Sequence, residues 1–138
     1  MPHVAMELLA PAGDWSALEA ALESGATAVY LGLTTLNARR RAKNFTQNEL
    51  AQAVEVAHRR NARVYLTLNV DMAERELGQA ARALELARQC GVDGVLIRDP
   101  ALLAFRDEFP EIAFHFSTQT CMANSADVAE AGKLGIAR

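Results

Sequence analysis

Residues 61–69 read NARVYLTLN, a short apolar run rich in β-branched and aromatic residues that opens and closes on a polar residue. The same pattern recurs at GATAVYLG (25–32), GVDGVLIRD (91–99) and EIAFHFSTQ (111–119). Such nearly continuous apolar runs are typical of strands that are buried on both faces of a parallel sheet. Residues 61–69 therefore represent one unit of a repeating α/β protein.

The segments between these runs carry apolar residues at helical spacing. Asp14 is expected to cap the first helix, and Thr46 with Glu49 has the spacing of a capping box for the second. Parallel strands that alternate with amphipathic helices imply right-handed crossovers. A further strand is expected at 6–10, the start of a sixth at 136–138, and helices at 15–25, 46–60, 74–90, 100–109 and 125–134.

Two architectures fit this alternation. A (β/α)8 barrel usually takes about 250 residues, so 138 residues would supply its first five to six βα units. An open, doubly wound sheet of flavodoxin type fits the length better, but a glycine-rich phosphate turn after the first strand is not evident. Periodicity alone leaves the two architectures nearly even.

Composition narrows the function classes. Hydrophobic residues make up 51% of the chain, charged residues 22%, and the formal net charge is −3. These values are ordinary for a soluble domain and give no overall attraction to nucleic acid or to an anionic membrane. No membrane span or signal peptide is expected, which predicts a cytoplasmic protein. The two cysteines are expected to be reduced and independent, with Cys121 buried.

Polar residues follow every predicted strand. In both architectures ligands bind where the carboxyl ends of parallel strands meet, so these residues predict a shared site at that rim. Helix capping is the favoured role for Asp14, Asp99, Asn124 and Ser125, whereas Asn69, expected inside its strand, is as well suited to function as to structure.

The dense basic stretch Arg39-Arg40-Arg41 with Lys43 follows the second strand. A charge run is usually a solvated face, but here it occupies the predicted rim, where guanidinium groups suit carboxylate or phosphate. Anion binding is slightly favoured, with at most two of the three arginines pointing inward. His115 is expected to be a core histidine. The histidines and cysteines have no metal-ligand spacing, and no G-x-S-x-G, P-loop or H-E-x-x-H motif is present.

Five separated stretches, in this order, resemble the collagenase-like peptidase family U32: ELLAPAGDWSALEAALESGATAVYLG (7–32), RAKNFT (41–46), VYLTLNV (64–70), LIRDPALL (96–103) and HFSTQTCMANS (115–125). The resemblance covers residues 7–138 and implies the N-terminal part of a TIM-like barrel. It favours the barrel over the open sheet and a single partial domain, residues 1–138, that is truncated near strand six.

The resemblance also implies a site at the rim, with catalytic residues left undefined. Two sets of positions match the family's motifs. Candidate substrate-binding residues are Glu7, Tyr30, Arg39, Arg41, Asn69, Ser117 and Gln119; structural rim residues are Pro11, Gly13, Gly32, Asp99 and Asn124.

Three functions follow from the family. The first is RNA hydroxylation (tRNA or rRNA) by a longer protein with an anionic co-substrate such as prephenate. The second is a collagenase-like peptidase, with a metal-dependent mechanism as one option. The sequence shows no Ser–His–Asp or Cys–His arrangement that would support a protease mechanism. The third is a non-catalytic fold fragment that self-associates through open sheet edges. No cofactor is expected within this chain, which alone is expected to be inactive; an iron–sulfur cluster would require the family's C-terminal cysteines.

Overall fold

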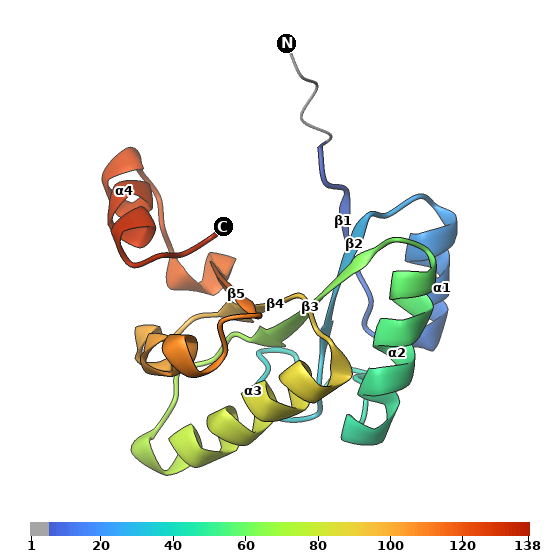
Figure 1. Cartoon of the computed structure of the whole chain (residues 1–138), viewed down its shortest axis with the longest axis horizontal. Helices are drawn as coiled ribbons and strands as arrows, with labels where there is room; N and C mark the ends of the chain where they lie inside the picture. The colour runs from blue at the N-terminus through green and yellow to red at the C-terminus, as the bar shows by residue number, and fades with distance from the viewer. Residues whose placement is uncertain (1–5) are drawn as a thin grey trace.

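The computed structural model describes residues 6–138, in which five strands alternate with helices (Figure 1). The strands are β1 (Leu9–Pro11), β2 (Ala28–Gly32), β3 (Arg63–Leu68), β4 (Gly94–Ile97) and β5 (Ala113–Phe116). The α-helices are α1 (Trp15–Glu23), α2 (Gln47–Arg59), α3 (Leu77–Cys90) and α4 (Ser125–Lys133); the 3₁₀ helices are η1 (Glu74–Glu76), η2 (Pro100–Glu108) and η3 (Thr118–Thr120). The predicted alternation is confirmed.

All five strands are parallel, and their order in the sheet is β1-β2-β3-β4-β5. A flavodoxin-type sheet has the order 2-1-3-4-5. Its third strand is added on the other side of the first strand, so the order of the strands reverses although all of them stay parallel. The order observed here is that of successive strands in a barrel, so among the two predicted architectures it fits the barrel. In Figure 1, α1, α2 and α3 lie along one side of the strands and the C-terminus lies on the other.

The strand register separates two faces. The face toward the helices carries aliphatic and aromatic residues that are almost fully buried, and they form one core with apolar residues of the helices. These strand residues are Val29, Leu31, Val64, Leu66, Leu68, Val95, Ile97 and Phe114. Burial of this face is the main source of stability, because apolar area contributes about 25 cal/mol per Å² removed from water.

The opposite, inner face carries polar side chains, and it curves. Glu7 precedes β1 at one edge of the sheet, and Arg138 follows β5 at the other edge, yet their side chains form an ion pair. In a flat sheet the outer strands β1 and β5 would be about 19 Å apart, because neighbouring strands are spaced by about 4.8 Å. The sheet therefore curls strongly around its inner face, as the wall of a barrel does.

Local signals set the helix starts as expected. The Asp14 carboxylate accepts a hydrogen bond from the backbone of Ala17 (2.8 Å) and caps α1, and the Asn124 side chain caps α4. The Glu49 carboxylate accepts hydrogen bonds from both the backbone and the hydroxyl of Thr46. Ser125, expected as a cap, is instead the first residue of α4.

Several expectations need correction at the element ends. The short helix expected at residues 100–109 is present as a 3₁₀ helix over Pro100–Glu108, whereas β3 ends at Leu68, so Asn69 lies just beyond the strand. Residues 136–138 are not a strand, although two backbone hydrogen bonds join them to β5. Cys121 is exposed, with a left-handed backbone (φ 58°), because it ends η3 at the surface. Among residues 6–138, no helix combines the length and apolarity needed to cross a bilayer.

Candidate functional site

The loop between Leu33 and Phe45, here called the arginine loop, lies where β2 ends and is built around Asn37. This side chain is only 4% exposed; its amide nitrogen donates to the Leu33 carbonyl (3.2 Å) and to the Asn44 side chain (2.7 Å). Its oxygen accepts from the backbone of Arg39 (3.0 Å). Gly32 makes this possible, since a Cβ there would lie 2.1 Å from the Asn37 nitrogen.

The arginine loop is also held by Asn44 and Asn69. The Asn44 amide donates to the carbonyls of Arg39 and Ala42, both at 3.0 Å. The Asn69 side-chain oxygen accepts from the backbone of Ala38 (3.1 Å), across from the end of β3. The two roles left open for Asn69 are thus partly resolved: its oxygen serves the loop structure.

The three arginines project from this scaffold. Arg39, Arg40 and Arg41 are all exposed, and none forms an ion pair or a side-chain hydrogen bond with residues 6–138. Lys43 lies 3.7 Å from the Asp14 carboxylate, and both groups are solvated. A pair of that kind contributes little, about 0–1 kcal/mol, so the positive charge of the loop remains largely uncompensated.

A hydrogen bond and an ion pair join the loop after β3 to the loop after β4 at the rim. Asp99 accepts a hydrogen bond from Ala101 as the cap of η2 and another from Met72 in the loop after β3, both at 2.9 Å. Arg98 forms an ion pair with Asp71 (2.8 Å) in that same loop. The structural role predicted for Asp99 therefore extends to joining two neighbouring loops.

The loop after β5 completes the rim. The Ser117 hydroxyl accepts a hydrogen bond from Gln119 N–H (3.2 Å) and starts η3. The Thr120 hydroxyl donates to the Ile97 carbonyl (3.3 Å) at the end of β4. Gln119 is exposed, and its side chain forms no hydrogen bond within residues 6–138.

The remaining rim candidates are less constrained. Tyr30 is half-buried on the inner face, and Pro11 is the exposed last residue of β1. A Cβ at Gly13 would lie 3.8 Å from the Lys43 carbonyl, an ordinary contact, so the space around Gly13 does not require glycine.

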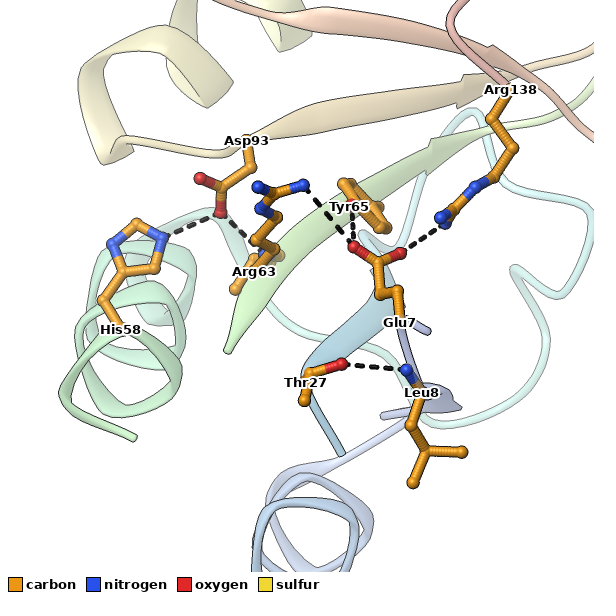
Figure 2. Close-up of polar contacts among 9 residues, drawn as sticks. Glu7, Leu8, Thr27, His58, Arg63, Tyr65, Asp93 and Arg138 are labelled. Carbon is orange, nitrogen blue, oxygen red and sulfur yellow. Dashed lines mark hydrogen bonds and ion pairs between the residues drawn. The ribbon is translucent and has the colours of Figure 1, made fainter. Parts of the chain in front are cut away.

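One candidate lies at the other end of the sheet. Glu7 was expected at the carboxyl rim, but it precedes β1 and lies among residues at the amino ends of the strands (Figure 2). Its carboxylate accepts from the Tyr65 hydroxyl (2.8 Å) and pairs with Arg138 and Arg63. Glu7 lies there because it precedes the strand, as it would also in the strand expected at residues 6–10, and its substrate-binding role stays a prediction.

The charge state of this amino-end cluster follows from its contacts. Burial raises the pKa of Glu7, but the hydrogen bonds from Tyr65 and Arg138 outweigh burial, so the pKa lies below its ordinary value of 4.5. Burial and the hydrogen bond to Glu7 raise the pKa of Tyr65. At neutral pH the cluster therefore holds an ionised carboxylate, a neutral phenol and two guanidinium ions.

His115 packs at the centre of the inner face, as the core histidine that was expected. It is 5% exposed, its Nδ1 has no hydrogen-bond partner among residues 6–138, and its ring meets Tyr65 edge-on with the ring centroids 4.8 Å apart. This contact crosses Gly94 on the intervening strand, where a Cβ would lie 3.0 Å from the Tyr65 ring. Burial, followed by the charge of Arg138, lowers the pKa of His115, so the ring is neutral at pH 7.

The geometry carries no legible hydrolytic centre within residues 6–138. The His58 imidazole lies 2.8 Å from the Asp93 carboxylate, which also accepts from the backbone of Val64 (2.8 Å; Figure 2). No serine or cysteine of this range forms a hydrogen bond with His58, so a nucleophile–base pair is not assembled. The same range contains no group of three or more His, Cys, Asp or Glu side chains placed to hold a metal ion.

Sequence reasoning overlooked the residues that organise both ends of the sheet. Asn37 was not selected at the rim, and Arg63, Tyr65 and Arg138, whose side chains contact Glu7, were not selected either. The position of Asn37, five residues after a strand-ending glycine, was the available signal for the loop. No local signal marks Arg138, because its partner is 131 residues away.

Comparison with known proteins identifies the family. The model of peptidase family U32 matches residues 13–138. An uncharacterized protease of Methanocaldococcus jannaschii is 38% identical, over 88% of this chain and 30% of its own length. The tRNA hydroxylation protein P1 of Bacillus subtilis is 34% identical (86% and 28%), and a 23S rRNA 5-hydroxycytidine synthase of Escherichia coli is 37% identical (83% and 17%).

The fold comparison agrees. The solved structure of the U32 peptidase Mk0906 aligns with a TM-score of 0.75 at 18% identity, covering 95% of this chain and 56% of that one. The chain spans less than a third of the length of the curated relatives named above. On the strength of the family match and the shared fold, the chain belongs to peptidase family U32.

Proposed function

We propose that this chain forms part of the substrate site of an RNA-hydroxylating enzyme that uses a small anionic co-substrate such as prephenate. The observation that carries this proposal is the arginine loop: a firmly hydrogen-bonded scaffold presents uncompensated guanidinium groups at the carboxyl ends of the strands. The names of relatives at 37% and 34% identity, which act in rRNA and tRNA hydroxylation, support the same proposal.

The remaining rim candidates suit the co-substrate. The exposed Gln119 amide and the half-buried Tyr30 offer hydrogen bonds to a carboxylate. The reacting centre would be completed by parts of the enzyme outside this chain, and residues 1–138 alone are expected to be inactive. Cytoplasmic RNA would be the substrate.

Mass spectrometry of nucleosides tests this function. Deletion of the gene for the protein that contains this chain is expected to remove a hydroxylated nucleoside from purified tRNA or 23S rRNA, and reintroducing the gene restores it. Cells that cannot make prephenate are expected to lose the same nucleoside. Unchanged nucleosides in the deletion strain would exclude the proposal.

Peptide hydrolysis is the second candidate, because the relative at 38% identity carries a protease name. It predicts that the purified enzyme cleaves gelatin and that Asn69→Ala, which releases the arginine loop, abolishes the cleavage. Cleavage that persists in the variant would indicate a contaminating protease.

Self-association is the expected behaviour of the isolated chain. An apolar groove of about 390 Å³ runs beside the open edge of β1, lined in part by the exposed Leu8 and by Ala10, Ala17 and Ala21. A second copy would cover this groove and the unpaired backbone of β1. Light scattering should then give a mass above that of one chain, and a Leu8→Asp variant should shift it toward the monomer; a monomeric wild type at high concentration contradicts this.

A further inference from the structure

We propose that the arginine loop contacts the sugar–phosphate backbone of RNA, rather than enclosing a small co-substrate. This inference rests on the proposed function and assigns to Arg39, Arg40 and Arg41 the polyanion as their ligand.

The backbone beneath the arginines is fixed from two sides. Leu36 adopts a left-handed conformation (φ 55°) and is 7% exposed, so its side chain anchors the start of the loop in the core. The asparagines described above then bind the backbone of residues 38, 39 and 42. A loop with so many anchors presents its outer side chains at low entropic cost, which favours binding.

Unlike most other arginines of the chain, those of the loop have no carboxylate partner within the described residues, 6–138. Arg88 pairs with Glu85 (2.6 Å) and Arg98 with Asp71 (2.8 Å), for example. Residues 39–43 carry four positive charges, although the chain as a whole has a net charge of −3. Any attraction of a polyanion to this protein must therefore come from a local cluster of charge, and residues 39–43 are the densest run of positive residues in the sequence.

The presentation of the side chains favours a polyanion over one small carboxylate. A co-substrate site normally buries most of its ligand, and a few hydrogen-bond donors point at that ligand from several sides. Here three successive arginines of one turn are exposed, so their guanidinium groups can meet successive phosphates. Each guanidinium can bind a phosphate with two parallel hydrogen bonds, and each contact releases counterions.

The salt dependence of RNA binding tests the inference. Fluorescence anisotropy with a labelled single-stranded RNA, between 50 and 200 mM salt, gives the slope of log Kobs against log salt concentration. For the double variant Arg39→Ala/Arg41→Ala, we expect the slope to fall in magnitude by about 1.4, since each phosphate contact to a single strand contributes about 0.7. Arg39→Lys/Arg41→Lys should retain the slope, because it retains the charges.

A matched control removes the same charge elsewhere. The variant Arg60→Ala/Arg82→Ala removes two exposed arginines, Arg60 at the end of helix α2 and Arg82 on helix α3. Neither has a carboxylate partner among residues 6–138. We expect its slope to equal that of the wild type, and circular dichroism should show that every variant is folded.

Three results would overturn the inference: no RNA binding by the wild type, equal slopes for the loop and control variants, or loss of prephenate binding in the loop variant with its RNA slope intact. The last result would make the loop a small-anion site. The proposed function is judged separately by the nucleosides. A deletion strain that loses hydroxylation while the loop variant keeps its RNA slope retains the function and excludes this inference.

Discussion

Replacing Gly32 by alanine should release the arginine loop, because the side chain of Asn37 occupies the space where a Cβ would stand. That Cβ would lie 2.1 Å from the Asn37 nitrogen, 2.7 Å from its Cγ and 2.9 Å from the Thr67 hydroxyl. Atoms cannot approach so closely, and Asn37 is buried. We therefore expect its side chain to be expelled, with the loss of its three hydrogen bonds.

The expected cost follows from those bonds. Three hydrogen bonds at a net 0.5–1.5 kcal/mol each amount to about 1.5–4.5 kcal/mol. Alanine loses less backbone entropy than glycine when a strand forms, which returns about 0.5–1 kcal/mol. The free energy of unfolding should thus fall by about 0.5–4 kcal/mol in Gly32→Ala.

Urea denaturation followed by circular dichroism measures this change, and amide hydrogen exchange localises it to the N–H groups of Ala38 and Arg39. Gly78→Ala is the matched control, since Gly78 lies in helix α3 and the nearest atom to its added Cβ, on Arg82, would be 3.7 Å away. That variant should be more stable by up to about 1 kcal/mol. A Gly32→Ala protein that is as stable as the wild type, with unchanged exchange at Arg39, would refute the reasoning.

Four further outcomes are expected. Gly94→Ala should cost about 1–3 kcal/mol in urea denaturation, because its methyl group would lie 2.8 Å from a backbone oxygen of β5, whereas Gly132→Ala in helix α4, with open space around it, should be slightly stabilising. Stability should fall as pH drops below 6.5, because burial lowers the pKa of His115 in the folded chain and the unfolded chain therefore binds this proton first. His115→Gln should remove this pH dependence. Below about pH 4.5 stability should fall further, since Glu7 is protonated in the unfolded chain at a higher pH than in the folded chain. Glu7→Gln, which removes the titrating carboxyl group, should flatten this part of the profile of stability against pH. Tyr65→Phe should raise the pKa of Glu7, measured by NMR titration, and cost about 1 kcal/mol; an unchanged pKa would mean that the phenol does not support the carboxylate.

The carboxyl-end rim could be located from the sequence, but the use of its residues could not. Asp14, Asp99 and Asn124 were correctly assigned to helix caps, because a cap is a contact between residues two or three positions apart. Asn69 could not be assigned, because its partner at Ala38 lies on a different loop. Whether a polar strand end faces a ligand or a neighbouring loop depends on how the loops pack.

By itself the sequence determined the parallel α/β alternation, since runs of buried strand residues and helical periodicity are local patterns that the backbone must follow. It also determined most helix starts. Only the tertiary structure decided that Glu7 contacts Tyr65 and Arg138, and that Asn37 fills the space over Gly32. Both depend on strand register and sheet curvature, which arise from packing between residues far apart in the chain.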